Sequence, residues 1–365
     1  MGGGYGDYPD LARVKRVLVV CLKNIGDVVL ASPVFSALKG AVPGASVDAL
    51  VNGGTEDVLV ENPDIGEVIV LDRRALKGVF SRLAAELRLL GAVRSGKYDM
   101  VVTLSSGSRG RNVALLSGAR IRVGPEPKKK KIFGVPYFTD PVRHAPRGRH
   151  YVERNLDCLR RVGIFPEPGA RRTTFFEGAE ATSRARGLLD GAGIKGGEPY
   201  MVAHPTSRWM FKCWPAGKVA GLIDRVRTEC GLRVVLTSGP DGFEKAYVAD
   251  LLEALTTEVV DFSARLSLRE LGAVVRGARL FFGVDSAPMH IAAAVGTPVV
   301  ALFGPTSAVD WAPWGEGHRV ITSPDHECVP CGRDGCGGSK VSECLTDIGI
   351  STVFEAVRDG LRGDV

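Results

Sequence analysis

The chain has 365 residues, of which 45% are hydrophobic and 24% charged, and its formal net charge is +6. This composition excludes a mostly disordered chain and, at roughly 100–200 residues per domain, predicts about two globular domains. The N-terminus lacks the order of a secretory signal, and the longest stretch without Asp, Glu, Lys or Arg is broken by Pro288, Pro298 and Pro305, so we expect a cytoplasmic protein with no membrane span.

The first third of the chain alternates short apolar runs with helical patterns. A Val-rich run at 17–22 is typical of a buried parallel strand, and the helical pattern after it reaches Lys39, with Ser32 and Pro33 as the place where it would kink or restart. We then expect strands at 46–51, 67–71, 98–104 and 120–123, and helices near 55–61 and at 75–91 and 109–117. This alternation predicts a parallel, doubly wound sheet.

The pattern lapses between 124 and 170, where only 151–162 predicts a helix. Positions 119–154 hold ten Lys or Arg residues and three acids, so this window is more basic than the chain as a whole. A solvated loop explains such a run as well as a patch that binds an anionic partner does. Phosphorylated lipid and membrane headgroups are the favoured partners; nucleic acid is the weaker alternative, because no signature of DNA or RNA binding accompanies the charge.

The alternation resumes in the second half of the chain. We expect strands at 200–204, 232–237, 258–262, 279–283 and 297–303, helices at 215–229, 241–255, 267–276 and 286–295, and a final amphipathic helix at 351–361. The fold class is therefore α/β, with two open parallel sheets in tandem. Ligands bind at the carboxyl ends of strands in such sheets, so two facing sheets would enclose a cleft.

Two nucleotide-binding motifs are excluded or set aside. Gly191 to Gly196 match G-x-G-x-x-G, but they follow a helical stretch and precede a strand, which is the reverse of the dinucleotide context, so we interpret them as a helix stop and a turn. No P-loop motif occurs. No D-x-D motif occurs either, which argues against a glycosyl transfer that holds a metal through that motif.

Four of the eight cysteines are clustered with the spacing C-x2-C-x4-C-x7-C: Cys328, Cys331, Cys336 and Cys344. A structural metal site, for which zinc would be the first choice, and plain thiols are both open, because the spacing departs from the usual zinc pattern. A cytoplasmic setting argues against stable disulfides.

Three loops at predicted strand ends carry candidate chemistry. Asp285 and Ser286 begin a predicted helix whose exposed N–H groups suit a diphosphate, although an ordinary capped helix has the same residues. The 204–215 loop offers two hydroxyls and two cations for phosphate, or is a surface loop with packing tryptophans. Asp27, after the first strand, is placed either for general-base chemistry or as a helix cap.

These segments together resemble glycosyltransferase family 9, the ADP-heptose:lipopolysaccharide heptosyltransferases. The resemblance rests on Asn-Ile-Gly-Asp at 24–27 with Ser-Pro at 32–33, on the 204–215 loop, and on the 283–306 segment from Gly-Val-Asp-Ser-Ala-Pro-Met-His to Phe-Gly-Pro-Thr, and it extends roughly over 17–357. His-Pro-Thr-Ser-Arg at 204–208, Phe-Lys-Cys-Trp at 211–214 and Leu-Thr-Ser-Gly-Pro-Asp at 236–241 resemble most its heptosyltransferase III branch.

The resemblance implies a GT-B architecture of two Rossmann-like domains facing across a cleft. It assigns 1–170 to acceptor binding and 171–345 to the nucleotide sugar, and leaves 346–365 as a C-terminal helix with the option of packing back on the N-terminal domain. The implied reaction is an inverting, metal-independent transfer of heptose from ADP-heptose to a hydroxyl of the lipopolysaccharide inner core, with no cofactor. The implied place is the cytoplasmic face of the inner membrane, in peripheral contact with it.

The same resemblance assigns roles to individual residues. Asp27 would be the base that deprotonates the acceptor, and Lys212 the cation that stabilises the departing diphosphate. The donor would be bound by Thr206, Ser207, Gly239, Pro240, Asp241, Asp285, Ser286, Ala287 and His290. The anionic acceptor or the membrane would meet Lys128, Lys129, Lys130, Lys131, Arg143, Arg147 and Arg149. One departure from the family is Ala287, which puts a methyl where many members have glycine next to a phosphate.

Three other functions fit parts of the pattern. A transferase of the same fold with a different nucleotide-sugar donor and acceptor would need few changed contacts, and a nucleotide-sugar epimerase would turn over without an acceptor. A nucleotide-sugar-binding protein without turnover would need neither Asp27 nor Lys212. A dinucleotide oxidoreductase lacks its fingerprint in either sheet.

Overall fold

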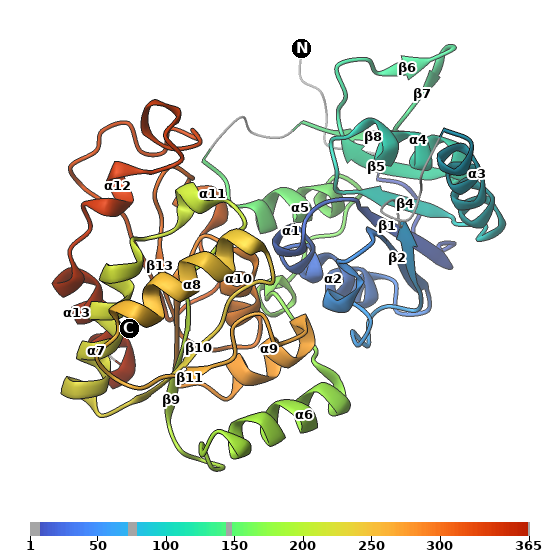
Figure 1. Cartoon of the computed structure of the whole chain (residues 1–365). Coiled ribbons are helices and arrows are strands. Elements are labelled where there is room, and N and C mark those ends of the chain that lie inside the picture. The colour runs from blue at the N-terminus through green and yellow to red at the C-terminus, as the bar shows by residue number, and fades with distance from the viewer. Residues whose placement is uncertain (1–7, 72–78, 144–147, 364–365) are drawn as a thin grey trace. The chain divides into compact units, whose positions relative to one another are not determined.

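The structure is a computed structural model that describes residues 8–71, 79–143 and 148–363 (Figure 1). The chain divides into two compact units, Met1–Thr173 and Thr174–Val365. Each unit contains one six-stranded sheet in which every neighbouring pair of strands is parallel. The predicted architecture of two doubly wound α/β units is confirmed.

The sheet of the first unit has the strand order β3-β2-β1-β4-β5-β8, so the direction of winding reverses between β1 and β4. Its strands are β1 (Arg16–Cys21), β2 (Ser46–Asn52), β3 (Val68–Leu71), β4 (Met100–Thr103), β5 (Ile121–Pro125) and β8 (Asp140–Val142). Its helices are α1 (Ile25–Val29), α2 (Ser32–Ala41), η1 (Glu56–Val58), α3 (Val79–Ser95), α4 (Ser108–Ser117), α5 (Tyr151–Arg160) and η2 (Pro168–Arg171). The apolar residues of β1 are completely buried, as expected for a strand covered on both faces by helices.

The sheet of the second unit has the corresponding order β11-β10-β9-β12-β13-β14, with the reversal between β9 and β12. Its strands are β9 (Tyr200–His204), β10 (Arg233–Leu236), β11 (Val260–Asp261), β12 (Leu280–Val284), β13 (Val299–Leu302) and β14 (His318–Ile321). Its helices are α6 (Gly178–Gly191), η3 (Met210–Lys212), α7 (Ala216–Cys230), α8 (Gly242–Ala254), α9 (Leu268–Arg276), α10 (Ala287–Ala294), α11 (Ala308–Trp311), η4 (Cys336–Gly338), α12 (Glu343–Thr346) and α13 (Ile350–Arg362).

The final helix belongs to the second unit. Val353, Phe354 and Val357 of α13 are buried in the same hydrophobic cluster as the strands of the second sheet, and α13 packs on α7. The apolar face of α13 is therefore part of the core of the second unit. The boundary between the two units lies after Thr173.

The elements that differ from expectation are short or at sheet edges. The expected helix at 55–61 is the single turn η1, whereas the restart of the first helix at Ser32-Pro33 is confirmed, since α1 ends at Val29 and α2 begins at Ser32. The start of the helix expected at 75–91 lies outside the described residues. The edge strands β8 and β14 and the antiparallel pair β6 (Lys131–Ile132) and β7 (Val135–Pro136) have too few apolar residues to give a strand pattern. None of the helices in the described ranges has the length and apolarity needed to cross a bilayer.

Candidate functional site

The loops at the reversal point of the second sheet gather most of the predicted donor-binding residues. β9 and β12 are neighbours, with Gly283 opposite His204, so the loop after His204 and the segment from Asp285 onward leave the same edge of the sheet. In open α/β sheets this reversal point is where ligands bind. The candidate donor site therefore lies at the edge of the second sheet where this type of fold places its ligands.

A buried ion pair lies at this edge. Lys212 Nζ is 2.6 Å from Asp285 Oδ2, and the two side chains are only 12% and 9% exposed. The ammonium group also lies 4.9 Å from the ring centre of Trp209. The loop that carries Lys212 is fixed by Trp214, which is completely buried and donates its indole N–H to the Ile348 carbonyl at 3.2 Å. A positive charge is thus held in place beside a carboxylate in a water-poor setting.

Two buried hydroxyl groups on loops at this edge of the sheet have no hydrogen-bond partner among the described residues. Ser286 is the residue before α10, and Thr306 follows β13, the neighbour of β12 in the sheet. Their Oγ and Oγ1 atoms are buried and make no hydrogen bond with any described residue. Since buried polar groups are normally satisfied, these two hydroxyls point to a ligand with hydrogen-bonding oxygens. The first N–H groups of an α-helix have no acceptor within the helix, so the amides that begin α10 suit an anion at the same place.

Thr206 is hydrogen-bonded to helix α8. Its hydroxyl donates to Glu244 Oε2 at 2.6 Å, and the same carboxylate oxygen accepts the Gly239 amide at 2.8 Å. Glu244 is buried in the first turn of α8, and a Cβ on Gly239 would come within 2.4 Å of its carboxylate. In this arrangement the Thr206 proton is directed at Glu244, which ties the loop to α8, and the contact of Thr206 with the donor stays a prediction.

Ser207 and His204 also stabilise the loop. Ser207 Oγ accepts the Trp209 amide at 3.3 Å, and the Ser207 amide points to Cys213 Sγ at 3.2 Å. His204 Nδ1 is 3.0 Å from Thr237 Oγ1, and burial lowers the pKa of His204 to about 3. His204 is therefore neutral at pH 7 and serves as a hydrogen-bonding core residue.

The remaining donor-binding predictions divide between surface and interior. Pro240 and Asp241 are exposed, at the turn that begins α8, whereas Ala287 is half-buried at the start of α10. His290 is buried in the second turn of α10. The exposed positions after the carboxyl end of β10 are accessible to a ligand. The side chain of His290 is instead packed inside the unit, below the start of α10.

In the first unit, Asp27 lies in α1, directly after the carboxyl end of β1. Its Oδ2 accepts the Asn24 amide at 3.3 Å, and its Oδ1 is 3.5 Å from Lys23 Nζ. Lys23 in turn contacts the Tyr151 hydroxyl and lies over the Tyr151 ring at 4.3 Å. Asp27 is 12% exposed, and the Asn24 amide and Lys23 hold its carboxylate near the surface of the unit.

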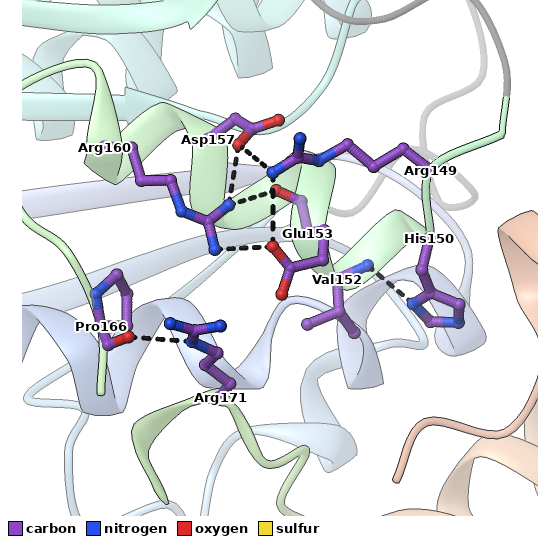
Figure 2. A network of polar contacts seen from close by, with 8 residues as sticks. All are labelled: Arg149, His150, Val152, Glu153, Asp157, Arg160, Pro166 and Arg171. Carbon is purple, nitrogen blue, oxygen red and sulfur yellow. Dashed lines mark hydrogen bonds and ion pairs between the residues drawn. The ribbon is translucent and has the colours of Figure 1, made fainter. Parts of the chain in front are cut away.

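The N-terminal turn of α5, which carries Tyr151, is held by a network of ion pairs (Figure 2). Arg149 contacts Asp157 at 2.9 Å and Glu153 at 3.4 Å, and Arg160 contacts the same two carboxylates at 2.7 and 2.6 Å. The charge of Arg149, which was predicted to meet an anionic partner, is therefore engaged within the unit. Arg149 helps to fix the start of α5. Tyr151, at that start, contacts Lys23, which pairs with Asp27.

The other basic residues are more open. Lys128, Lys129, Lys130 and Lys131 are all exposed, and Arg147 lies outside the described residues. Lys130 and Arg143 both pair with Glu126, at 2.8 and 3.0 Å, and lower its pKa. No ion pair of Lys128, Lys129 or Lys131 is found within the described ranges, so these three ammonium groups carry the uncompensated charge.

The clustered cysteines are all free thiols. Burial raises the pKa of Cys344 to about 11, and the nearby Cys336, Cys331 and Cys328 contribute to the rise. Across residues 8–71, 79–143 and 148–363, no three His, Cys, Asp or Glu side chains are arranged to hold a metal ion. The four thiols thus share one region but do not form a ready coordination shell.

Residues 86–341 match the family described as glycosyltransferase family 9 (heptosyltransferase). The chain is 34% identical to lipopolysaccharide heptosyltransferase 3 of Escherichia coli over 307 aligned residues. The aligned region covers 84% of this chain and 88% of that protein. A glycosyl transferase family 9 structure from Veillonella parvula superposes with a TM-score of 0.83 at 22% identity, covering 97% of this chain and 99% of that one. The ADP-heptose lps heptosyltransferase II of E. coli superposes with a TM-score of 0.76 at 20% identity, covering 96% and 99%.

Proposed function

The chain belongs to glycosyltransferase family 9 and is a glycosyltransferase, and we propose that it transfers a heptose from ADP-heptose to a hydroxyl of the lipopolysaccharide inner core. The 34% identical relative carries the name of a lipopolysaccharide heptosyltransferase. The structural observation that carries the proposal is the Lys212–Asp285 pair at the same sheet edge as the buried hydroxyls of Ser286 and Thr306, which have no partner in the part of the chain that the structure describes. A cation and free hydroxyls at the reversal point of a sheet suit the diphosphate of a nucleotide sugar.

In the proposed reaction the acceptor oxygen attacks the anomeric carbon while the bond from that carbon to the diphosphate oxygen breaks. The acceptor proton goes to the Asp27 carboxylate, and the electron pair of the broken bond stays on ADP. Lys212 and the hydroxyl and amide groups at the start of α10 stabilise the negative charge that grows there. Attack opposite the leaving group inverts the anomeric centre.

We propose that the reaction needs no metal ion. The sequence has no D-x-D motif, and Lys212 supplies a fixed positive charge where the diphosphate would be bound. The ammonium can exchange the Asp285 carboxylate for phosphate oxygens when the donor binds. Asp285 would then be free to accept a hydroxyl of the sugar.

The acceptor is an anionic glycolipid, so we also propose that the first unit works at the cytoplasmic face of the inner membrane, in peripheral contact with it. The exposed, unpaired Lys128, Lys129 and Lys131 support this placement, because each basic residue near an anionic surface adds attraction.

The experiment is a transfer assay with ADP-heptose and inner-core lipopolysaccharide from a strain that lacks the side-branch heptose, read by the mass gain of one heptose. We expect transfer that persists with a chelator present and is lost in Asp27→Asn and Lys212→Met but kept in the surface control Lys245→Met. Calorimetry of ADP, UDP and GDP binding should favour ADP.

Other outcomes point to the rival functions. A preference for UDP or GDP, with no heptose transfer, would keep the transferase and discard the donor. Isomerisation of the nucleotide sugar without an acceptor would favour an epimerase. Nucleotide binding without any turnover would indicate a binding protein.

A further inference from the structure

The antiparallel pair β6 and β7 forms a small hairpin that extends from the first sheet (Figure 1). Ile132 pairs with Val135, so Phe133 and Gly134 alone form the turn. Both turn residues have positive φ, 47° for Phe133 and 80° for Gly134. This is the pattern of a type I′ turn, in which Asn-Gly is the favoured sequence.

Phenylalanine is a poor choice for this turn on two counts. A bulky residue at positive φ is strained, whereas asparagine tolerates that conformation. The Phe133 side chain is also 97% exposed, the highest value among the exposed large hydrophobic residues of the described chain. Neither local conformation nor packing explains the residue, so its ring is available for a contact outside the unit.

The base of the hairpin is firmly held. Tyr137 and Phe138, which follow β7, are buried in the core of the first unit. Arg122 donates to the carbonyls of Pro136, Tyr137 and Ala119 at 3.2, 3.1 and 2.8 Å. The hairpin is thus a short projection on a fixed base, with its aromatic residue at the tip.

The charge around the tip has one sign. Lys128, Lys129 and Lys131 are exposed on the approach to the turn, and no ion pair of theirs is found in the part of the chain that the structure describes. On the other strand Val135 is 48% exposed. Apolar side chains at a tip with lysines behind them match a bilayer surface, where the ring enters the interface and the ammonium groups meet anionic headgroups.

We propose that the β6–β7 hairpin is a membrane-docking element that inserts Phe133 into the interface of an anionic bilayer while Lys128, Lys129 and Lys131 bind its headgroups. This inference deepens the membrane contact of the proposed function and rests on it for its biological purpose, but it is tested without the transfer reaction. The occupant is the lipid surface, not the sugar of the acceptor.

The test is co-sedimentation of the full chain with vesicles of phosphatidylcholine containing phosphatidylglycerol, compared with vesicles of phosphatidylcholine alone. We expect binding to the anionic vesicles that weakens as salt rises. Phe133→Asn should reduce the partition coefficient about tenfold or more, because the variant loses the ring that the bilayer would bury. Replacing Lys128, Lys129 or Lys131 by Ser should reduce it by roughly fivefold each.

Phe133→Asn is a clean variant because asparagine suits the turn, so its melting temperature should equal or exceed that of the wild type. Phe165→Asn is the matched control: Phe165 lies in the same unit and is 61% exposed, and its replacement should leave vesicle binding unchanged. Phe133→Trp should keep binding and show a blue-shifted emission that brominated lipids quench.

Wild-type chain that ignores anionic vesicles, or Phe133→Asn that binds them as the wild type does, would overturn the proposal. The proposal would also be overturned if a delipidated core oligosaccharide protected the emission of the Phe133→Trp variant from quenching by brominated lipids. That result would make the hairpin an acceptor site instead. Failure of the proposed function is separate: a chain that binds vesicles through Phe133 but transfers no heptose keeps the docking element and loses the reaction.

Discussion

The reversal points of the two sheets have the same topology and different chemistry. β1 and β9 occupy the same place in their sheets and end in the buried residues Cys21 and His204. Burial raises the pKa of Cys21 to about 12 and lowers that of His204 to about 3, so both strand ends are uncharged at pH 7. Charge begins only in the loops that follow.

Those loops differ in how their charge is held. In the first unit Asp27 is 3.5 Å from Lys23 in a helix of only five residues, and one carboxylate oxygen serves the helix start. In the second unit Lys212 and Asp285 make a close 2.6 Å pair, and two nearby loop hydroxyls, of Ser286 at the start of α10 and of Thr306 after β13, have no hydrogen-bond partner among the described residues. The first arrangement suits proton acceptance and the second suits anion binding. The scaffold sets the place, and the loops set the chemistry.

Substitutions that affect only one of the two loops test whether the loops have different chemical roles. Asp27→Asn removes the proton acceptor but keeps the amide-to-side-chain contact of the helix start, so kcat should fall by about 10²–10⁴. The KM for ADP-heptose and the affinity for ADP should stay within about twofold of wild type, because the proposed donor site lies in the second unit. Steady-state kinetics and calorimetry measure these values. Asp10→Asn is the control, and a kcat above a tenth of wild type would reduce Asp27 to a helix-start residue.

Lys212→Met should affect both stability and rate. Loss of the cation leaves Asp285 buried without its partner, which should lower the free energy of unfolding by about 3 kcal/mol, and kcat should fall by about 10²–10³. Adding Asp285→Asn should restore most of the stability in urea unfolding without restoring kcat. If the double variant regained activity along with stability, Lys212 would be structural only.

His204 makes the second unit sensitive to acid. Its folded-state pKa of about 3 lies below the ordinary value, so the unfolded chain takes up the proton first as pH falls. Stability contributed by neutral His204 is present above about pH 6.5 and is lost toward pH 3, with a loss of about 2 kcal/mol between pH 7 and pH 5. Urea unfolding at both values measures it. His204→Gln should flatten this dependence; an unchanged slope would contradict the assignment.

Much of the fold could be predicted because buried strands of a parallel sheet are continuous apolar runs. β1, β9 and β12 were located within a residue or two for that reason. The edge strands β8 and β14 could not be, since Asp-Pro-Val and His-Arg-Val-Ile have no such run. The single-turn η1 was overestimated as a helix, because local propensity does not fix helix length.

The site could be predicted only as far as local patterns reach. Asp285 and Lys212 were expected at the same site through resemblance, but nothing in their spacing announces a direct pair across 73 residues. Glu244 was missed, although an acid three positions after Asp241 at a predicted helix start is a recognisable capping pattern. Tyr151, which contacts Lys23 from 128 positions away, gave no sequence signal at all.

The smallest predicted effects concern the two buried hydroxyls of the second unit, whose removal should change stability and ADP affinity in different ways. Ser286→Ala and Thr306→Val remove buried hydroxyls that have no partner within the described residues, so the free energy of unfolding should stay within about 0.5 kcal/mol of wild type or rise. Each change should weaken ADP binding by about 1 kcal/mol, roughly fivefold, because a diphosphate oxygen loses its donor. Paired urea unfolding and calorimetry test this, with Thr182→Val, on the exposed surface of α6, as the control. Loss of stability without loss of ADP affinity would mean that the hydroxyls serve the fold, and the anion site would then rest on Lys212 and the α10 amides alone.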